Sequence, residues 1–81
     1  MKQYERDGIR PKAGDRQVIR FLMDRLHVST SDADIEADIR ARAARSDMVG
    51  PTGYVDACVD YALKIHHENQ RLYRRVMGGS I

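Results

Sequence analysis

One long apolar stripe in the C-terminal third most constrains what this chain can fold into. From Tyr54 to Val76, apolar side chains recur at helical spacing, and neither Gly nor Pro interrupts them before Gly78. The pattern predicts a helix over residues 53–77. The residues that share one face of it are Tyr54, Cys58, Tyr61, Ala62, Ile65, Leu72, Tyr73 and Val76.

A helix of that length is long for a chain of 81 residues. At about 1.5 Å per residue it spans roughly 37 Å, whereas a compact domain of this size has a radius of gyration of about 12 Å. We therefore expect its last turns to project beyond the core. The apolar residues of those turns are Leu72, Tyr73, Val76 and Met77. The alternative is a helix that bends or stops near Asn69, with the N-terminal segment folded over the rest.

Two shorter helices are predicted upstream. Residues 15–27 carry an apolar arc of about 200°, which makes this helix the expected centre of the core. Residues 32–46 carry a narrower stripe of Ile35, Ile39 and Ala43, preceded by Ser31 as a candidate N-cap. For the helix over 53–77 the candidate N-cap is Thr52.

These patterns, with no strand-like alternation, predict an all-α fold: a small three-helix domain with an irregular N-terminal arm and a long C-terminal helix. The basic arm covers residues 1–14, and the single helical domain covers residues 15–81. The residues expected to be buried together are Ile19, Leu22, Leu26, Ile35, Ile39, Cys58 and Ile65.

The content of cysteine and apolar residues limits the setting and the size of the core. A single Cys excludes an intrachain disulfide, which favours a reducing, cytoplasmic location. No apolar run is long enough for a membrane span or a signal peptide, so no membrane partner is expected. With one Phe and an alanine-rich middle helix the core is thin, which favours a homo-oligomer or a protein partner.

The side chains that could carry chemistry do not form a recognisable catalytic or metal motif. His66 and His67 are adjacent and point about 100° apart on a helix, and neither has a histidine four residues away. Cys58 lies within the apolar stripe, where an inert core residue is the expected role. We therefore expect no metal, no cofactor, no small-molecule substrate and no enzymatic activity.

The order helix, turn, helix over residues 15–46 has the length of a DNA-binding helix-turn-helix, but its charges disfavour that role. A recognition helix presents its N-terminal residues to the DNA. Here that end would place four carboxylates against a polyanion: Asp32, Asp34, Glu36 and Asp38. The placement of anions at the start of the helix and cations at its end instead suits the helix dipole.

Two functions remain open. The first is a non-enzymatic interaction module, regulatory or adaptor in kind, that associates with itself as a homodimer or binds a partner protein. Its partner-binding residues are Arg71, Leu72, Tyr73, Arg75, Val76 and Met77. The alternative is a nucleic-acid-binding accessory protein that uses both basic ends. Its contact residues would be Lys2, Arg6, Arg10, Lys12, Arg71, Arg74 and Arg75.

Overall fold

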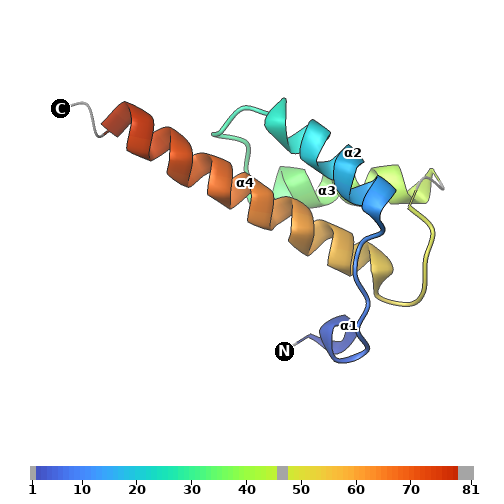
Figure 1. Ribbon diagram of the computed structural model, residues 1–81. Helices are drawn as coiled ribbons and strands as arrows, with labels where there is room; N and C mark the ends of the chain where they lie inside the picture. Colours follow the sequence, from blue (N-terminus) through green and yellow to red (C-terminus); the bar gives the residue numbers. More distant parts are fainter. Residues whose placement is uncertain (1, 46–47, 79–81) are drawn as a thin grey trace.

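The computed structural model describes residues 2–45 and 48–78. Within these ranges the chain forms helices and no strand, so the predicted all-α class is confirmed (Figure 1). The helices are α1 (Gln3–Arg6), α2 (Ala13–Asp24), α3 (Asp32–Ala44) and α4 (Tyr54–Gly78). α3 and α4 begin within one residue of the predicted starts. The predicted end of α3, residue 46, lies outside the described residues.

α4 is the element on which the other helices pack. α1, α2 and α3 each contact α4, whereas α2 and α3 make no close backbone contact with each other. The prediction that the helix over 15–27 lies at the centre is therefore wrong. The buried face of α4 spans an arc of about 200° from Ala57 to Val59, wide enough for two helices. Small side chains on this face, at Cys58 and Ala62, allow their close approach.

α2 and α3 run in opposite directions along α4. Arg20 Nε donates to Tyr61 Oη at 3.0 Å, and Asn69 Nδ2 donates to Asp24 Oδ1 at 3.4 Å, so α2 is parallel to α4. On the α3 side, Asp32 lies beside His67 and Arg40 beside Asp56, so α3 is antiparallel to α4. These cross-links place both helices over the part of α4 that precedes residue 71.

The core forms where α2, α3 and the loop before α4 meet the buried face of α4. Of the residues expected to be buried together, Ile19, Ile35, Ile39, Cys58 and Ile65 are buried. Leu22 and Leu26 are only partly buried, which corrects their assignment. Their place is taken by two methionines, Met23 on α2 and Met48 in the loop. α2 ends at Asp24, so Leu26 lies beyond the helix and is not on its core-facing side.

α3 begins after a side-chain cap, whereas α4 begins after a glycine with a positive φ. Ser31 caps α3 as predicted, because its hydroxyl accepts the N–H of Asp34 at 3.2 Å. At α4 the carbonyl of Gly53 accepts the first helical N–H, from Ala57 at 3.0 Å, so Gly53 rather than Thr52 holds the cap position. Gly53 has φ +87°, a conformation that glycine adopts at little cost.

The N-terminal segment is more ordered than the irregular arm predicted for residues 1–14. It contains α1, and the side chain of Tyr4 is 8% exposed and packs toward α4. Asp60 accepts hydrogen bonds from the Tyr4 hydroxyl and from Lys2 Nζ, the latter at 2.7 Å. A buried aromatic ring and an ion pair therefore fasten this segment to the first half of α4.

Candidate interaction surface

The last two turns of α4 extend beyond the helices that cover the rest of it. Near this end, Asn69 bonds to Asp24, and the Gln70 amide donates to the Val28 carbonyl at 2.7 Å. Every residue from 71 to 78 is exposed. Figure 1 shows this end of α4 projecting from the body, in a molecule that measures 47 × 27 × 22 Å. The predicted projection is confirmed, and α4 does not stop near Asn69.

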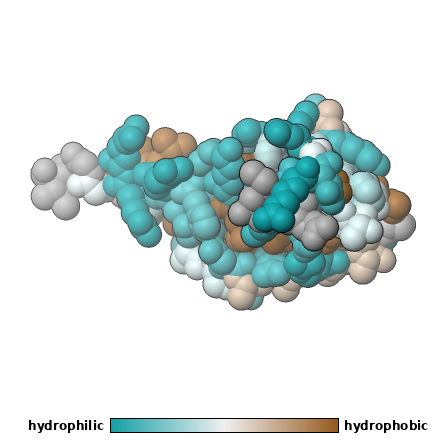
Figure 2. Space-filling model, turned by 90° about the horizontal axis from the view of Figure 1, so that it is seen from below, coloured by the Kyte–Doolittle hydropathy of each residue, from teal (hydrophilic) through white to brown (hydrophobic). Residues whose placement is uncertain are grey.

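An apolar stripe runs along this projecting end, which we call the α4 end (residues 71–78). Its exposed fractions are 55% for Leu72, 49% for Tyr73, 69% for Val76 and 57% for Met77. At 100° per residue these side chains fall on the same face of α4 as the buried Cys58, so the stripe continues the core face into solvent. Figure 2 shows apolar surface on the projecting end, bordered by hydrophilic side chains.

Arginines occupy the opposite face of the α4 end. Arg71, Arg74 and Arg75 are exposed, and no carboxylate lies between residues 71 and 78. Helical spacing places them within an arc of about 100°, across the helix from the stripe. The α4 end is therefore amphipathic and cationic.

The basic residues of the N-terminal segment do not join the α4 end in one surface. Lys2 is paired with Asp60, and this hydrogen bond raises the pKa of its ammonium group above the ordinary value. Lys12 Nζ donates to the Val49 carbonyl at 2.8 Å and lies over the Tyr54 ring. Arg6 and Arg10 are exposed. The segment is fastened to α4 at Asp60, about 16 Å along the helix axis from residue 71.

A groove of about 850 Å³ is bounded by α1, α3 and the first half of α4, and we call it the acidic groove. Its apolar lining includes Tyr4, Val59 and Leu63. Its charged lining comprises four carboxylates, Asp7, Glu36, Asp56 and Asp60, and two cations, Lys2 and Arg40, so its formal charge is −2.

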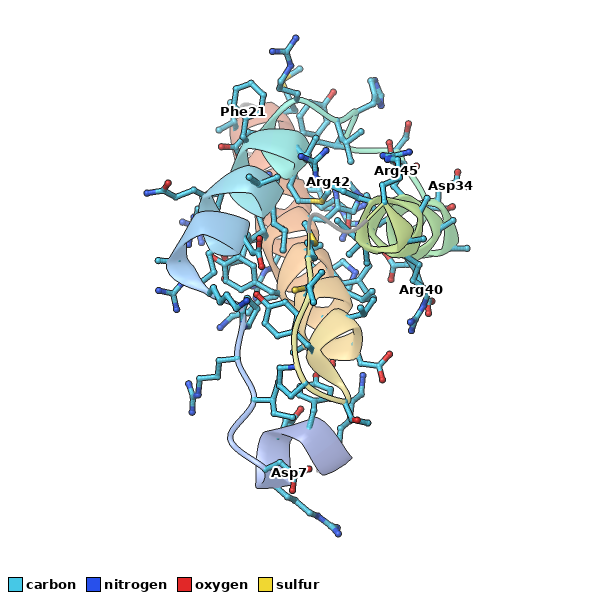
Figure 3. All side chains as sticks on the ribbon, turned by 90° about the vertical axis from the view of Figure 1, so that its right-hand side faces the viewer. Asp7, Phe21, Asp34, Arg40, Arg42 and Arg45 are labelled. Atoms are coloured by element: carbon cyan, nitrogen blue, oxygen red, sulfur yellow. The ribbon has the colours of Figure 1, made fainter. Side chains whose placement is uncertain are left out.

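Arg40 links the α3 wall of the acidic groove to α4. It lies 3.0 Å from Glu36 and 2.8 Å from Asp56. The hydrogen bond that Arg40 donates to Asp56, followed by the one it donates to Glu36, raises the pKa of the guanidinium above its ordinary value. In Figure 3, Arg40 projects from α3 toward the side on which Asp7 and α1 lie, whereas Asp34 projects from another side of α3.

A second exposed aromatic residue lies on α2 and was not foreseen as a surface feature. Phe21 is 60% exposed, and the guanidinium carbon of Arg25 lies 5.2 Å from its ring centroid (Figure 3). The sequence placed Phe21 in the broad apolar arc of that helix. Among the described helices, α2 makes close backbone contact with α4 alone, and Phe21 lies on an edge of the arc that faces solvent.

The three histidines lie within hydrogen-bond distance of other groups of the fold. The His66 ring nitrogen Nε2 lies 2.8 Å from the Thr30 carbonyl, and His67 Nε2 lies 2.9 Å from Asp32. His27 Nδ1 lies 2.6 Å from the Ser29 hydroxyl. Among the described residues, no group of three or more His, Cys, Asp or Glu side chains is placed to hold a metal ion.

Comparison with known proteins adds no family to this description. No family model, no curated protein and no solved structure matches the chain. Within residues 2–45 and 48–78, no helix combines the length and apolar character required to cross a bilayer.

Proposed function

We propose that this protein is a non-enzymatic interaction module that binds a protein surface through the α4 end. The contact residues are Arg71, Leu72, Tyr73, Arg75, Val76 and Met77. The observation that carries the proposal is the continuation of the core face of α4 into solvent for about two turns. Apolar surface of this kind, bordered by Arg and containing Tyr, is typical of protein interaction sites.

The condition of the titratable groups supports a non-enzymatic role. Cys58 is fully buried, and burial raises the pKa of its thiol above the ordinary value, which disfavours a nucleophilic thiolate. Tyr54 is also buried and hydrogen-bonded to Asp15. These groups hold the start of α2 against α4, so their contacts serve the fold.

The arrangement of cations favours this proposal over nucleic-acid binding through both basic ends. Lys2 and Lys12 are engaged within the protein, and the N-terminal segment and the α4 end lie apart. If nucleic acid were the partner, binding to a generic duplex would weaken steeply with salt and would fall after deletion of residues 1–13. We expect no such binding near physiological salt.

The proposal is tested by placing a carboxylate on the stripe. Val76→Asp should abolish partner binding or self-association, because the carboxylate would lose solvation at the interface without gaining a partner. Leu72→Asp should act in the same way. The readouts are mass from light scattering and retention of any protein that co-purifies with the tagged wild type.

The matched control is Val49→Asp. Val49 is 62% exposed and lies in the loop before α4, so this variant introduces the same chemistry outside the proposed surface. Circular dichroism should show native helix content in all three variants. If Val76→Asp and Val49→Asp retain the same partners and the same mass as the wild type, the proposal is wrong.

A further inference from the structure

We propose that the α4 end docks into the acidic groove of a second copy of this chain. This inference rests on the proposed function and names its partner. The contact is helix-in-groove: the apolar stripe of one copy covers the apolar lining of the groove, and the net negative charge of the groove attracts the arginines of the α4 end.

Charge complementarity identifies the groove. The α4 end carries Arg71, Arg74 and Arg75 without a carboxylate, and the acidic groove has a formal charge of −2. Arg74 and Arg75 lie about 60° from the two edges of the stripe, so their long side chains can extend toward the rim while the stripe faces the floor. The opposite charges also favour encounter of the two surfaces.

The apolar lining provides the second match. Val59 and Leu63 of α4 and Tyr4 of α1 line the acidic groove, and its volume of about 850 Å³ lies within the range of ligand-binding clefts. Burying the exposed stripe against the apolar lining lowers the free energy of the complex, because both surfaces are removed from water. Charge alone would give a weak contact, since exposed ion pairs contribute little.

A different hollow on the molecule is a poorer match. A groove of about 250 Å³ lies between α2 and α3 and is lined by Leu22, Leu26 and Ile39. Its charged residues are Asp38, Arg42 and Arg45, a formal charge of +1. A cationic helix end is therefore disfavoured there, and the groove is also smaller.

The α4 end cannot occupy the groove of its own chain. Val59 and Leu63 belong to the same continuous helix as Val76, and the midpoints of the two segments are about 20 Å apart along its axis. The helix would have to break for its end to return. A second copy must therefore supply the groove.

Each contact pairs two different patches, the α4 end of one copy and the acidic groove of the other. Each copy donates one end and offers one groove. This geometry predicts an outcome that pairing of two identical ends does not: a copy with a defective end and a copy with a defective groove should still associate with each other.

The experiment uses two full-length variants with sedimentation and light scattering. Val76→Asp disables the end, and Glu36→Lys combined with Asp56→Lys disables the groove. Wild-type protein should self-associate. For each variant alone, the dissociation constant of self-association should be at least about tenfold higher than that of the wild type. An equimolar mixture should form a one-to-one heterodimer, since one partner retains an intact groove and the other an intact end.

A matched control separates groove charge from net charge. Asp34→Lys combined with Asp38→Lys changes net charge by the same amount on exposed side chains of α3 that do not line the groove. It should associate as the wild type does. The second groove variant is Asp7→Lys, at a position outside the helices. It should weaken association even if the variant that combines Glu36→Lys with Asp56→Lys does not fold.

The outcomes distinguish this inference from the proposed function. A strictly monomeric wild type overturns the inference and leaves the α4 end free to bind another protein. Dissociation by Val76→Asp but not by the groove variants also overturns it, and indicates that ends pair with each other. An equimolar mixture that remains monomeric also overturns the inference. If Val76→Asp behaves as Val49→Asp does, both proposals are wrong.

Discussion

At the residue scale, Tyr54 joins the start of α2 to the start of α4. Its hydroxyl donates to Asp15 and accepts the backbone N–H of Lys12 at 2.9 Å, while its ring packs against Gly50. A Cβ on Gly50 would lie 2.4 Å from that ring, so glycine is required there by the close approach. Burial, followed by the hydrogen bond to Asp15, raises the pKa of Tyr54 from 10.0 to about 12.

This shift predicts a loss of stability at alkaline pH. Because the folded-state pKa is raised, the contribution of Tyr54 is fully present below pH 10 and is lost as pH rises through about 12. The loss should be of the order of 2 kcal/mol. Urea denaturation between pH 8 and 12 measures it. Tyr54→Phe should be less stable at pH 8 and should show a shallower decline, and an equal decline would contradict the assignment.

A second residue-scale prediction concerns Cys58. It is fully buried and its thiol has a raised pKa, so a thiol reagent should reach it only when the core opens. The labelling rate should be far below that of the unfolded chain and should rise with denaturant in parallel with unfolding. Rapid labelling of the native protein, at the rate of an exposed cysteine, would show that this core position is open.

Sequence reasoning could place Cys58 in the core because periodicity reports burial directly. It could not find the partners of Tyr54, nor the pairing of Lys2 and Tyr4 with Asp60. These contacts join residues 39 to 58 positions apart. Local patterns contain no information on such pairings, which depend on how the helices are arranged in space.

At the element scale, α2 contributes to the core through a narrower face than its sequence suggests. Met23 is 2% exposed, whereas Leu22 is partly buried and lines the groove between α2 and α3. Met23→Ala should therefore lower the free energy of unfolding by about 2 to 5 kcal/mol. Leu22→Ala should cost less, about 1 kcal/mol, because water already reaches that side chain.

Chemical denaturation of the two alanine variants measures this difference. Similar losses above about 2 kcal/mol for both would indicate that α2 and α3 close on Leu22 in solution. The α2 face was misjudged for a physical reason. An apolar arc shows which side of a helix avoids water, but the number of helices packed against it depends on its neighbours.

The boundaries of α4 were predicted closely, since Pro51 and Gly53 mark the start of the helix and Gly78 marks its end. The end of α2 was not, because Arg25, Leu26 and His27 contain no residue that stops a helix. There the last turn tightens, with Arg25 N–H donating to the Leu22 carbonyl at 3.3 Å and Leu26 N–H to the Met23 carbonyl at 3.2 Å. The apolar stripe of the α4 end was visible in the sequence, but the acidic groove was not, because three separate elements build it.

At the scale of the whole molecule, the α4 end should be dispensable for folding. Asn69 and Gln70, just before it, hydrogen-bond to Asp24 and Val28 of the body, whereas every residue from 71 to 78 is exposed. Deleting residues 71–81 should change the free energy of unfolding of the isolated subunit by less than about 1 kcal/mol, measured by denaturation at low protein concentration. A loss above about 2 kcal/mol would mean that these residues belong to the fold and not to an interface.

The order of the helices along the chain also determines when they can fold during synthesis. α2 and α3 precede α4, yet they lack close backbone contact with each other, and their contacts with α4 are its main packing. A ribosome adding about 5 to 20 residues per second needs roughly 2 to 7 s to proceed from the end of α3 to the end of α4. During that interval the apolar faces of α2 and α3 have no surface to cover them. The nascent segment can therefore fold only after α4 has been made. Chaperones that hold apolar segments can bind it before the native structure forms.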